Sequence, residues 1–366
     1  MSNPVYINAY DIISPLGIGV ENNWNALVNN QSGIRLHAFK NEELPLGKIQ
    51  SIQPTNPAYT ILENLVIQSI ENTLAQVEVD IQAEDFLLIL STTKGNIHLL
   101  NEEEAFDRQR ARLGIMASSI QHYFKCKHTP VVLSNACVSG VMAVGYAKKY
   151  IEHGHYKNII VCGVDILSAF VVEGFLSFKA LSKKICMPFD KNREGINIGE
   201  CVASVLLSQS NLSKNDVYIK GSATSNDANH ISGPSRTGDG LAIAIKESML
   251  EAQVSASDID FISAHGTATI YNDEMESKAI ESLQLNHVPI NSFKGYIGHT
   301  LGAAGIAEII FSVLSMQNQL LIRSLGCIET DYPIHIIKQN QAVNIRHTLK
   351  LSSGFGGCNA VMLLAI

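Results

Sequence analysis

The sequence has no pair of cysteines at the C-x-x-C spacing of zinc and redox sites, and its seven cysteines stand singly. Scattered cysteines in an odd number argue against a disulfide framework and favour a reducing cytoplasm. Charged residues make up only 17% of the chain and the net charge is −7, so nothing in the composition indicates a nucleic-acid surface. We therefore expect a cytoplasmic protein that does not bind nucleic acid.

Targeting and membrane signals are also missing. Met1–Tyr10 lacks the basic region followed by an apolar run that marks a signal peptide. The apolar stretch Val131–Ala147 is too short for a membrane span and is interrupted by polar residues. The 366 residues are 46% hydrophobic and include 26 glycines, which suits a large α/β core with many tight turns. We expect no membrane span.

A faint internal repeat runs through the chain. Strand-like and helix-like segments recur in the same order in two halves. The pairs are Val5–Asn8 with Val217–Lys220, Ala75–Val77 with Ala252–Val254, Phe86–Leu90 with Ile259–Ile262, Val131–Leu133 with Val288–Ser292, Gly140–Glu152 with Gly302–Met316, and the closing strands Ile159–Gly163 and Val202–Leu207 with Leu349–Ser353 and Ala360–Leu364.

This alternation of strands and helices predicts the fold class. Strands separated by helices of this length indicate parallel sheets that are covered on both faces. Two such units predict a duplicated five-layer α/β/α/β/α sandwich with a pseudo-twofold axis. We expect residues 1–210 to form the N-terminal half and residues 211–366 the C-terminal half.

A candidate nucleophile stands where a predicted strand meets a predicted helix. Ser134–Gly140 reads Ser-Asn-Ala-Cys-Val-Ser-Gly, with Cys137 at the junction. Backbone N–H groups at a helix start lower the pKa of a thiol, and a tight turn projects the side chain from the sheet edge. The alternative is a buried cysteine that acts as a small hydrophobic residue.

A candidate histidine follows the predicted strand Ile259–Ile262. His265 would lie at the carboxyl end of this strand, where open α/β sheets place their sites. A hydrogen-bonded structural histidine is the alternative. Asp273 and Glu276 lie three residues apart, on one face if a helix begins there. A capping or salt-bridge role is favoured for these two carboxylates over catalysis.

Two further segments offer polar groups. His299 stands just before Leu301–Gly305, near a helix start whose dipole would keep its ring neutral and able to donate an N–H to a developing oxyanion. Lys294, if buried, would need a partner, and a surface lysine is the alternative. The glycine-rich turn Ser353–Asn359 can offer N–H groups to an anion. A plain hairpin is the other interpretation of that turn.

Together and in this order, the four segments resemble the β-ketoacyl–acyl-carrier-protein synthases, condensing enzymes of the thiolase superfamily. The resemblance rests on SNACVSG, SAHGTATIYNDEME, KGYIGHTLGAAG and GFGGCN, and it spans nearly the whole chain. Further matches are Ser14–Gly17, Pro188–Glu200 and Asn226–Pro234. In the segment Ser91–Gly95 and in its departures from the common family pattern, the chain resembles synthases of polyene or pigment pathways.

The resemblance implies a thiolase-like fold and a Cys–His–His site. Cys137 would carry the acyl group, and the N–H groups of Cys137 and Phe355 would form an oxyanion hole. His265 and His299 would hydrogen-bond the malonyl thioester oxygen during decarboxylation. The implied reaction is a decarboxylative Claisen condensation that yields β-ketoacyl carrier protein.

Supporting roles are implied in the same way. Lys294 is similar to the family's lysine near the first histidine, and its implied partner is Glu276 or Glu200. Phe355 is similar to the family's gating phenylalanine at the acyl pocket. The implied substrates arrive on the phosphopantetheine of an acyl carrier protein, with no other cofactor and no metal.

The implied partners are an acyl carrier protein and a dimer mate, either a second copy or a homologous synthase or chain-length-factor subunit. Dimers of this fold pair across the strand that precedes the nucleophile. Departures from the family pattern leave substrate specificity open; they are Val138, Gly140, Cys201, Ala268, Asn272 and Cys358.

Three alternatives remain at this point. A non-catalytic chain-length-factor subunit shares the fold but lacks the nucleophile, which this chain retains. A coenzyme A-dependent thiolase would use a second cysteine, for which Cys358 is a candidate. A metal-binding protein would use cysteine and histidine together, although their spacing here does not suit a metal site.

Overall fold

The computed structural model describes residues 4–50, 52, 54–100, 106–213, 216–227 and 233–366. Residues 228–232, which belong to the segment Asn226–Pro234 that adds to the family resemblance, lie outside the described residues, as do residues 1–3. The strands are β1 (Val5–Ser14), β2 (Gly17–Ile18), β3 (Ile34–Phe39), β4 (Glu42–Gly47), β5 (Phe86–Ser91), β6 (Val131–Leu133), β7 (Asn158–Asp165), β8 (Cys201–Ser208), β9 (Tyr218–Asn226), β10 (Phe261–Ser263), β11 (Ile290–Asn291), β12 (Leu320–Leu321), β13 (Gln341–Ala342), β14 (His347–Gly354) and β15 (Cys358–Ala365). The helices are α1 (Val20–Val28), α2 (Ile61–Leu74), α3 (Leu113–Phe124), α4 (Ser139–Glu152), α5 (Ala169–Ser177), α6 (Asp239–Ala252), α7 (Ile270–Ser282), α8 (Lys294–Ile297) and α9 (Ala304–Asn318), with short 3-10 turns η1 (Ile97–Leu100), η2 (Arg108–Ala111), η3 (Ala256–Asp258) and η4 (Leu301–Ala303).

The main sheet shows the duplication that the repeat predicts. Its order is β11-β10-β14-β15-β9-β1-β8-β7-β5-β6, with β2 paired to β1. Outward from the β9–β1 junction, the two arms match strand for strand, β1-β8-β7-β5-β6 against β9-β15-β14-β10-β11. The directions agree as well, because β5 and β10 have parallel neighbours on both sides, whereas β8 and β15 are antiparallel to their neighbours.

The expectation of wholly parallel sheets is therefore wrong for part of each half. β15 runs antiparallel to β14, with Gly354 opposite Cys358. The intervening turn is too short for the crossover of a dozen or more residues that a parallel connection requires. The four strands β1, β8, β9 and β15 form the antiparallel centre of the sheet, and parallel pairing is confined to the outer strands.

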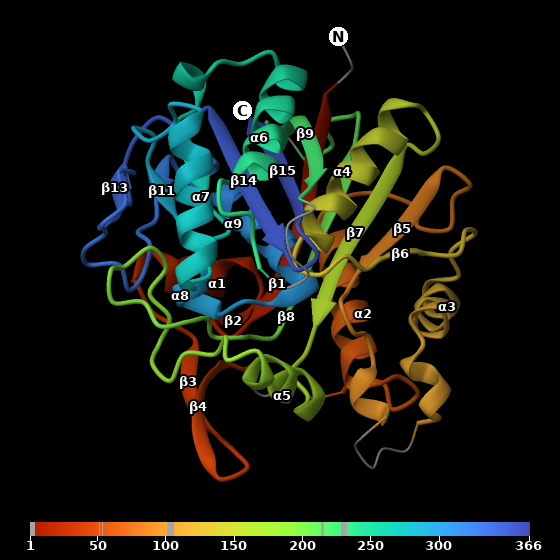
Figure 1. The fold of residues 1–366 in the computed structure, drawn as a ribbon. Coiled ribbons are helices and arrows are strands. Elements are labelled where there is room, and N and C mark those ends of the chain that lie inside the picture. The colour runs from red at the N-terminus through yellow and green to blue at the C-terminus, as the bar shows by residue number, and fades with distance from the viewer. Residues whose placement is uncertain (1–3, 51, 53, 101–105, 214–215, 228–232) are drawn as a thin grey trace.

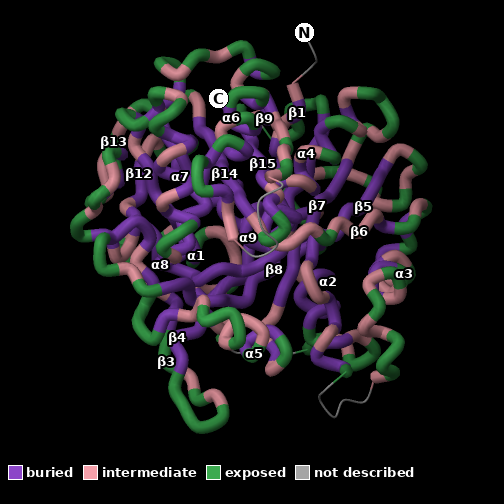
Figure 2. The backbone as a smooth tube through the Cα atoms, viewed as in Figure 1, coloured by how far each residue is buried: buried purple, intermediate pink, exposed green. Residues whose placement is uncertain are grey.

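The helices complete the five layers (Figure 1). α4 and α9 contact strands of both halves, so they form the central layer. α2 and α3 cover the outer face of the N-terminal half, and α6 and α7 cover that of the C-terminal half. Three large hydrophobic clusters fill the spaces between these layers. The sheet strands β1, β5, β7, β8, β14 and β15 and the helix α9 are buried almost throughout (Figure 2).

α9 is a long apolar helix of the central layer. Leu301–Asn318 is long and apolar enough to cross a membrane by composition alone, but 89% of this stretch is buried inside the protein. A helix that is hydrophobic on all sides is expected in the core of a large protein. The burial identifies this stretch as a core helix of the central layer.

Glycines let the two central helices approach closely. A Cβ atom on Gly305 would lie 2.6 Å from the backbone nitrogen of Val141, and one on Gly140 would lie 2.9 Å from that of Ile306. Real side chains do not tolerate contacts this short with backbone atoms. The close approach brings the start of α4, which follows Cys137, beside the start of α9, which follows His299.

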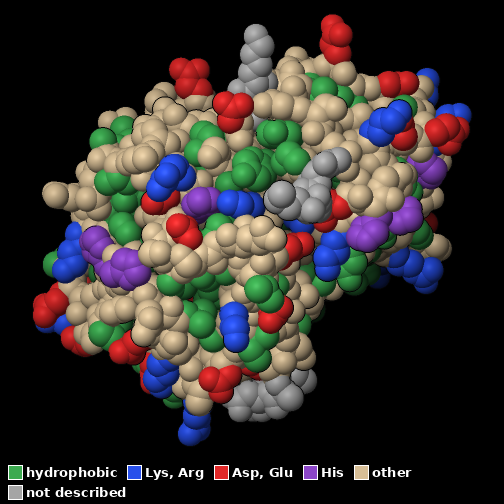
Figure 3. All heavy atoms as spheres, turned by 90° about the horizontal axis from the view of Figure 1, so that it is seen from above, with side chains coloured by type: hydrophobic (Ala, Val, Ile, Leu, Met, Phe, Trp, Pro, Cys, Tyr) green, Lys and Arg blue, Asp and Glu red, His purple; other side chains and the backbone are tan. Residues whose placement is uncertain are grey.

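Charge on the visible surface is mixed. On the face seen in Figure 3, the acidic and basic side chains of the described residues are interspersed, with no large area of one sign among them.

Candidate active site

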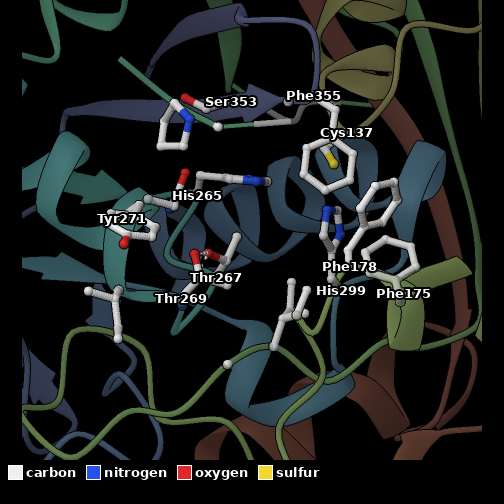
Figure 4. A pocket seen from close by; sticks show the side chains of 18 of the residues that line it. Cys137, Phe175, Phe178, His265, Thr267, Thr269, Tyr271, His299, Ser353 and Phe355 are labelled. Carbon is white, nitrogen blue, oxygen red and sulfur yellow. Dashed lines mark hydrogen bonds between the residues drawn. The ribbon is translucent and has the colours of Figure 1, made fainter. Parts of the chain in front are cut away.

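Cys137, His265 and His299 converge on one pocket. Their sulfur and ring nitrogen atoms lie within 4.8 Å of one another. The two imidazole rings have centroids 5.2 Å apart and stand at 85°, and both face the sulfur in Figure 4. The pocket has a volume of about 320 Å³ and opens to solvent. The sequence thus identified three residues that the fold brings together from both halves.

A strained turn presents Cys137. Between β6 and α4, Ala136 has φ 44°, in the left-handed region that residues other than glycine rarely adopt. The Ser139 hydroxyl accepts the N–H of Asn135 at 2.7 Å and donates to the carbonyl of Ala136 at 2.6 Å. These bonds fix the sharp elbow that the sequence predicts at this junction.

The thiol of Cys137 is not activated by its position alone. The residue is only 9% exposed, and burial raises the pKa of its thiol to about 11. The Lys294 ammonium and the N–H of Phe355, which donates toward the sulfur, lower this pKa by smaller amounts. The expectation that a helix start lowers the pKa of Cys137 is wrong, because loss of hydration in the closed site outweighs these effects.

His299 has one tautomer fixed by the backbone. The N–H of Leu301 donates to His299 Nδ1 at 3.1 Å, so Nδ1 is the acceptor and the neutral ring carries its proton on Nε2. Nε2 is buried, has no hydrogen-bond partner among the described residues, and faces the pocket. It is a free donor beside the sulfur of Cys137.

Both imidazoles are held neutral. Burial lowers the pKa of His265 and that of His299 well below the usual range, and the nearby cation of Lys294 lowers both further. The neutral ring expected for His299 therefore agrees with the structure, although burial, rather than a helix dipole, is the main cause. Neutral rings can donate to a developing oxyanion without the cost of a buried positive charge.

Two carboxylates anchor the backbone around His265. The Glu276 carboxylate accepts the N–H of His265 at 2.7 Å and that of Gly266 at 2.6 Å. Asp273 accepts the N–H of Thr267 at 3.0 Å. Burial raises the pKa of Asp273 to about 6 and that of Glu276 to about 7. Neither carboxylate caps the start of α7, where no side-chain cap bond forms among the described residues; both bind amides of the loop before it, and Asp273 also lies 3.8 Å from Arg193 Nε, in line with the salt-bridge role that was the other expectation.

Lys294 is buried, but its partner is not the expected one. Its ammonium contacts the carbonyl of His265 at 2.5 Å, His265 Nδ1 at 3.4 Å and Glu308 Oε1 at 2.6 Å. Because an ammonium has no acceptor, Nδ1 of His265 accepts and Nε2 carries the proton. The expectation of a pair with Glu276 or Glu200 is wrong.

Glu200 and Glu276 are occupied elsewhere. Glu200 accepts the N–H groups of Ile49 and Leu167, so it braces two loops at another place in the fold, and burial raises its pKa. Glu308 was missed by reasoning from the sequence. The available signal was a lone carboxylate inside the otherwise apolar run of α9.

Phe355 stands over the cysteine with two other aromatic rings. Its ring centroid lies 5.4 Å from that of Phe178 and 6.3 Å from that of Phe175, both from the α5 region. Figure 4 shows these rings grouped on the Cys137 side of the pocket. No sequence pattern indicated Phe175 and Phe178, because their proximity to residue 355 depends on the tertiary fold.

Cys358 lies outside this pocket. Its thiol donates to Asn135 Oδ1 at 3.2 Å.

The side chains and backbone that surround the pocket come from both halves. The lining residues are Cys137, Phe175, Phe178, Lys179, Ala180, Glu194, Gly195, Ile196, Gly233, Pro234, His265, Thr267, Thr269, Ile270, Tyr271, Asn272, His299, Ser353, Gly354 and Phe355.

Comparison with known families gives two adjoining matches. Residues 88–212 match the family described as Beta-ketoacyl synthase, N-terminal domain, and residues 217–327 match Beta-ketoacyl synthase, C-terminal domain. The two matches together cover more than half of the chain, and each falls within one half of the duplicated fold.

Individual relatives agree over full length. A protein of Schizosaccharomyces pombe, provisionally named as a mitochondrial 3-oxoacyl-[acyl-carrier-protein] synthase, is 30% identical and is covered over 97% of both chains. The 3-oxoacyl-[acyl-carrier-protein] synthase 2 of Coxiella burnetii is 25% identical, with 99% of this chain and 98% of that protein covered.

Solved structures give the same fold. A chain from the complex of a ketosynthase with its chain length factor from Xenorhabdus doucetiae superposes with a TM-score of 0.91 at 26% identity, covering 100% of this chain and 98% of that chain. A β-ketoacyl synthase from Burkholderia phymatum STM815 superposes with a TM-score of 0.90 at 21% identity, covering 100% and 99%. The thiolase-like fold class predicted from the sequence is confirmed.

Proposed function

The chain belongs to the beta-ketoacyl synthase family, and on that premise we propose that it condenses an acyl group held on Cys137 with a malonyl group held on an acyl carrier protein. The observation that carries the proposal is the convergence of one thiol and two neutral imidazoles within 4.8 Å. A pocket of this kind can hold a thioester and stabilise negative charge on its oxygen.

The first step transfers the acyl group to the enzyme. The sulfur of Cys137 attacks the carbonyl carbon of the acyl thioester, and the carrier thiol leaves with the proton. The N–H of Phe355 already points at the sulfur, so with the N–H of Cys137 it would bind the oxyanion that forms there. Because the thiol is protonated at neutral pH, attack and proton transfer are coupled in this step.

The second step forms the carbon–carbon bond. The N–H groups at Nε2 of His265 and His299 donate to the malonyl thioester oxygen while carbon dioxide leaves and an enolate forms. The enolate carbon attacks the acyl carbonyl, and the Cys137 thiolate leaves and regains a proton. Each imidazole donor would contribute about 3 kcal/mol to transition-state stabilisation.

The substrates define the proposed partners. The acyl and malonyl groups would arrive on the phosphopantetheine of an acyl carrier protein in the cytoplasm, with no other cofactor. β6 is an edge strand of the main sheet and its residues are only partly buried, so it can pair with a dimer mate. That mate would be a second copy or a homologous chain-length-factor subunit.

Acyl transfer to a single residue tests the proposal. The purified protein is mixed with a set of acyl-carrier thioesters, both saturated and conjugated, and the adduct is located by intact and peptide mass. We expect an acyl mass on Cys137, followed by a β-ketoacyl product when malonyl carrier protein is added. Cys137→Ala is the control and should give neither.

The same experiment separates the alternatives. A chain-length-factor subunit would give no adduct, and a thiolase would accept coenzyme A thioesters and require Cys358. The position of Cys358, bonded to Asn135 and outside the pocket, favours the condensing enzyme. Metal analysis tests the metal-binding alternative, because Cys137, His265 and His299 each offer one ligand atom and these atoms lie within 4.8 Å of one another.

A further inference from the structure

Two buried lysines share one buried glutamate behind the site. Lys294 Nζ lies 2.6 Å from Glu308 Oε1, and Lys350 Nζ lies 2.5 Å from Glu308 Oε2. The side chains of both lysines are 0% exposed and that of the glutamate is 1% exposed. If all three groups are ionised, this cluster carries one surplus positive charge inside the protein.

Strand geometry explains how a lysine reaches this place. Leu349 and Leu351 pack into the outer hydrophobic cluster of the C-terminal half. Because side chains alternate along a strand, Lys350 in β14 points to the opposite face, where α9 and Glu308 lie. An apolar residue would be the ordinary occupant of such a position, since burying an ammonium group is costly.

Lys350 binds the backbone that leads into His265. Its ammonium donates to the carbonyls of Ala264 at 3.2 Å and Ser263 at 3.3 Å, and also to its neighbour Leu351 at 2.6 Å. Ser263 and Lys350 are register partners in the parallel ladder of β10 and β14. The chain around His265 is therefore held through its carbonyls by lysines and through its amides by carboxylates.

The surplus charge faces the two imidazoles. The ionisable groups around the rings are Cys137 from the elbow, Lys294 from α8, Glu308 from α9, Glu276 from α7 and Lys350 from β14. Lys350 lowers the pKa of His265 and of His299, after the larger effects of burial and Lys294. Since Glu308 already has Lys294 as a partner, a second lysine is not needed to neutralise it.

We propose that Lys350 is a second positioning cation of this site: it shares Glu308 with Lys294, fixes the carbonyls that precede His265, and supplies positive charge that keeps both imidazoles neutral. The inference rests on the proposed function in one respect, because the proposed function uses the neutral rings as donors to a thioester oxygen. Protonation of His299 at Nδ1 would break the bond from the N–H of Leu301, and protonation of His265 at Nδ1 would break its contact with Lys294. Activity is therefore lost as the rings gain protons.

Two substitutions separate the charge of Lys350 from its hydrogen bonds. Lys350→Met removes both and leaves the Lys294–Glu308 pair. Lys350→Gln removes the charge but keeps an N–H donor for the carbonyls. The matched control is Lys148→Met, because Lys148 is 1% exposed and paired with Glu152 and Glu251 on α4 and α6, outside the catalytic pocket.

Two readouts follow each variant. Ring-proton NMR, assigned with His265→Ala and His299→Ala, gives the pH at which each imidazole gains a proton. Removal of the buried charge of Lys350 should raise the pH at which each imidazole gains a proton by about one unit, in both Lys350→Met and Lys350→Gln. The acid limb of malonyl-carrier decarboxylation should move up by the same amount, with kcat at pH 8 falling more in the Met variant than in the Gln variant.

Several results would overturn the proposal. The first is an unchanged ring titration and acid limb in both variants, and the second is a shift no larger than that of Lys148→Met. Failure of both Lys350 variants to fold would show a purely structural role. If the wild-type protein does not decarboxylate malonyl carrier protein, the proposed function fails, but the ring titrations still decide the role of Lys350.

Discussion

The carboxylate of Asp165 accepts the backbone N–H of Gly302 at 2.7 Å. Asp165 ends β7 in the N-terminal half, and Gly302 lies just after His299 in the C-terminal half. The same carboxylate accepts the N–H of Thr93 at 2.9 Å and the hydroxyl of Thr92 at 2.9 Å. One buried side chain thus ties the start of the central helix to the opposite half of the fold.

We predict that Asp165→Asn is strongly destabilising. In the variant, an amide NH2 group would replace one carboxylate oxygen and would face the N–H and hydroxyl donors that this oxygen accepts in the wild type. A buried donor left unpaired costs about 1–3 kcal/mol. Chemical denaturation at pH 7 measures the loss. The matched control is Asp85→Asn at an exposed ion pair with Lys157, which should change stability by less than about 0.5 kcal/mol.

The same substitution has a predicted pH dependence. Burial raises the pKa of Asp165 above its unfolded value, so the folded state holds the proton more tightly. The contribution of this group to stability is then fully present below the unfolded pKa and declines as pH rises through the folded pKa. The stability lost in Asp165→Asn should therefore be larger at pH 4 than at pH 7, and equal losses would contradict the assignment.

The two histidines should affect the second step more than the first. We predict that His265→Ala or His299→Ala lowers malonyl decarboxylation by roughly a hundredfold or more, because each removes an N–H donor to the thioester oxygen. Acylation of Cys137 should fall far less, since its oxyanion contacts the N–H of Phe355. Separate assays of acyl transfer and carbon dioxide release test this, and equal losses in both steps would count against the assigned roles.

Alkylation of Cys137 should rise steadily with pH. Because burial raises the pKa of this thiol to about 11, the thiolate fraction increases about tenfold per pH unit from pH 7 to 10. The rate of iodoacetamide labelling at residue 137, measured by peptide mass, should show no plateau in this range. A plateau near pH 7 would mean that a preformed thiolate exists in the resting enzyme.

Cys358→Ser should leave condensation nearly intact. Its thiol bonds to Asn135 and does not line the pocket, so a hydroxyl can take over the same contact. Product formation from acyl and malonyl carrier proteins measures the effect, with Cys137→Ser as the inactive reference. Equal losses in the two variants would support a thiolase with two catalytic cysteines.

Local patterns in the sequence were sufficient for the nucleophile and both histidines. Each follows a strand and stands in a short motif of small residues, so strand position and side-chain chemistry together identify Cys137, His265 and His299. The repeat of segment order also predicted the duplicated sheet. These features depend on residues close in sequence, or on an order that survives in both halves.

The buried ion pairs could not be found in this way. Lys294 has its partner on the next long helix, and the choice of Glu308 over Glu276 depends on which helix face packs against which strand. Lys350 looks like an interruption of an apolar strand until its alternation with Leu349 and Leu351 is placed against α9. The high pKa of Cys137 is likewise a consequence of burial, which the local motif does not reveal.

The approach of α4 and α9 gives a last prediction. Gly305→Ala would place a Cβ 2.6 Å from the backbone nitrogen of Val141, so the two helices must separate. Overpacking of this kind typically costs about 1–3 kcal/mol. Gly174→Ala in α5 is the control, because a Cβ there meets nothing within 4 Å and alanine favours a helix by about 0.5–1 kcal/mol.

Thermal unfolding and acyl transfer should both report this separation. The melting temperature should fall in Gly305→Ala and stay the same or rise in Gly174→Ala. Because α4 begins just after Cys137 and α9 just after His299, separating the helices should also slow condensation at temperatures where the variant remains folded. A folded Gly305→Ala variant with full activity would show that the sulfur and the rings do not depend on this contact for their alignment.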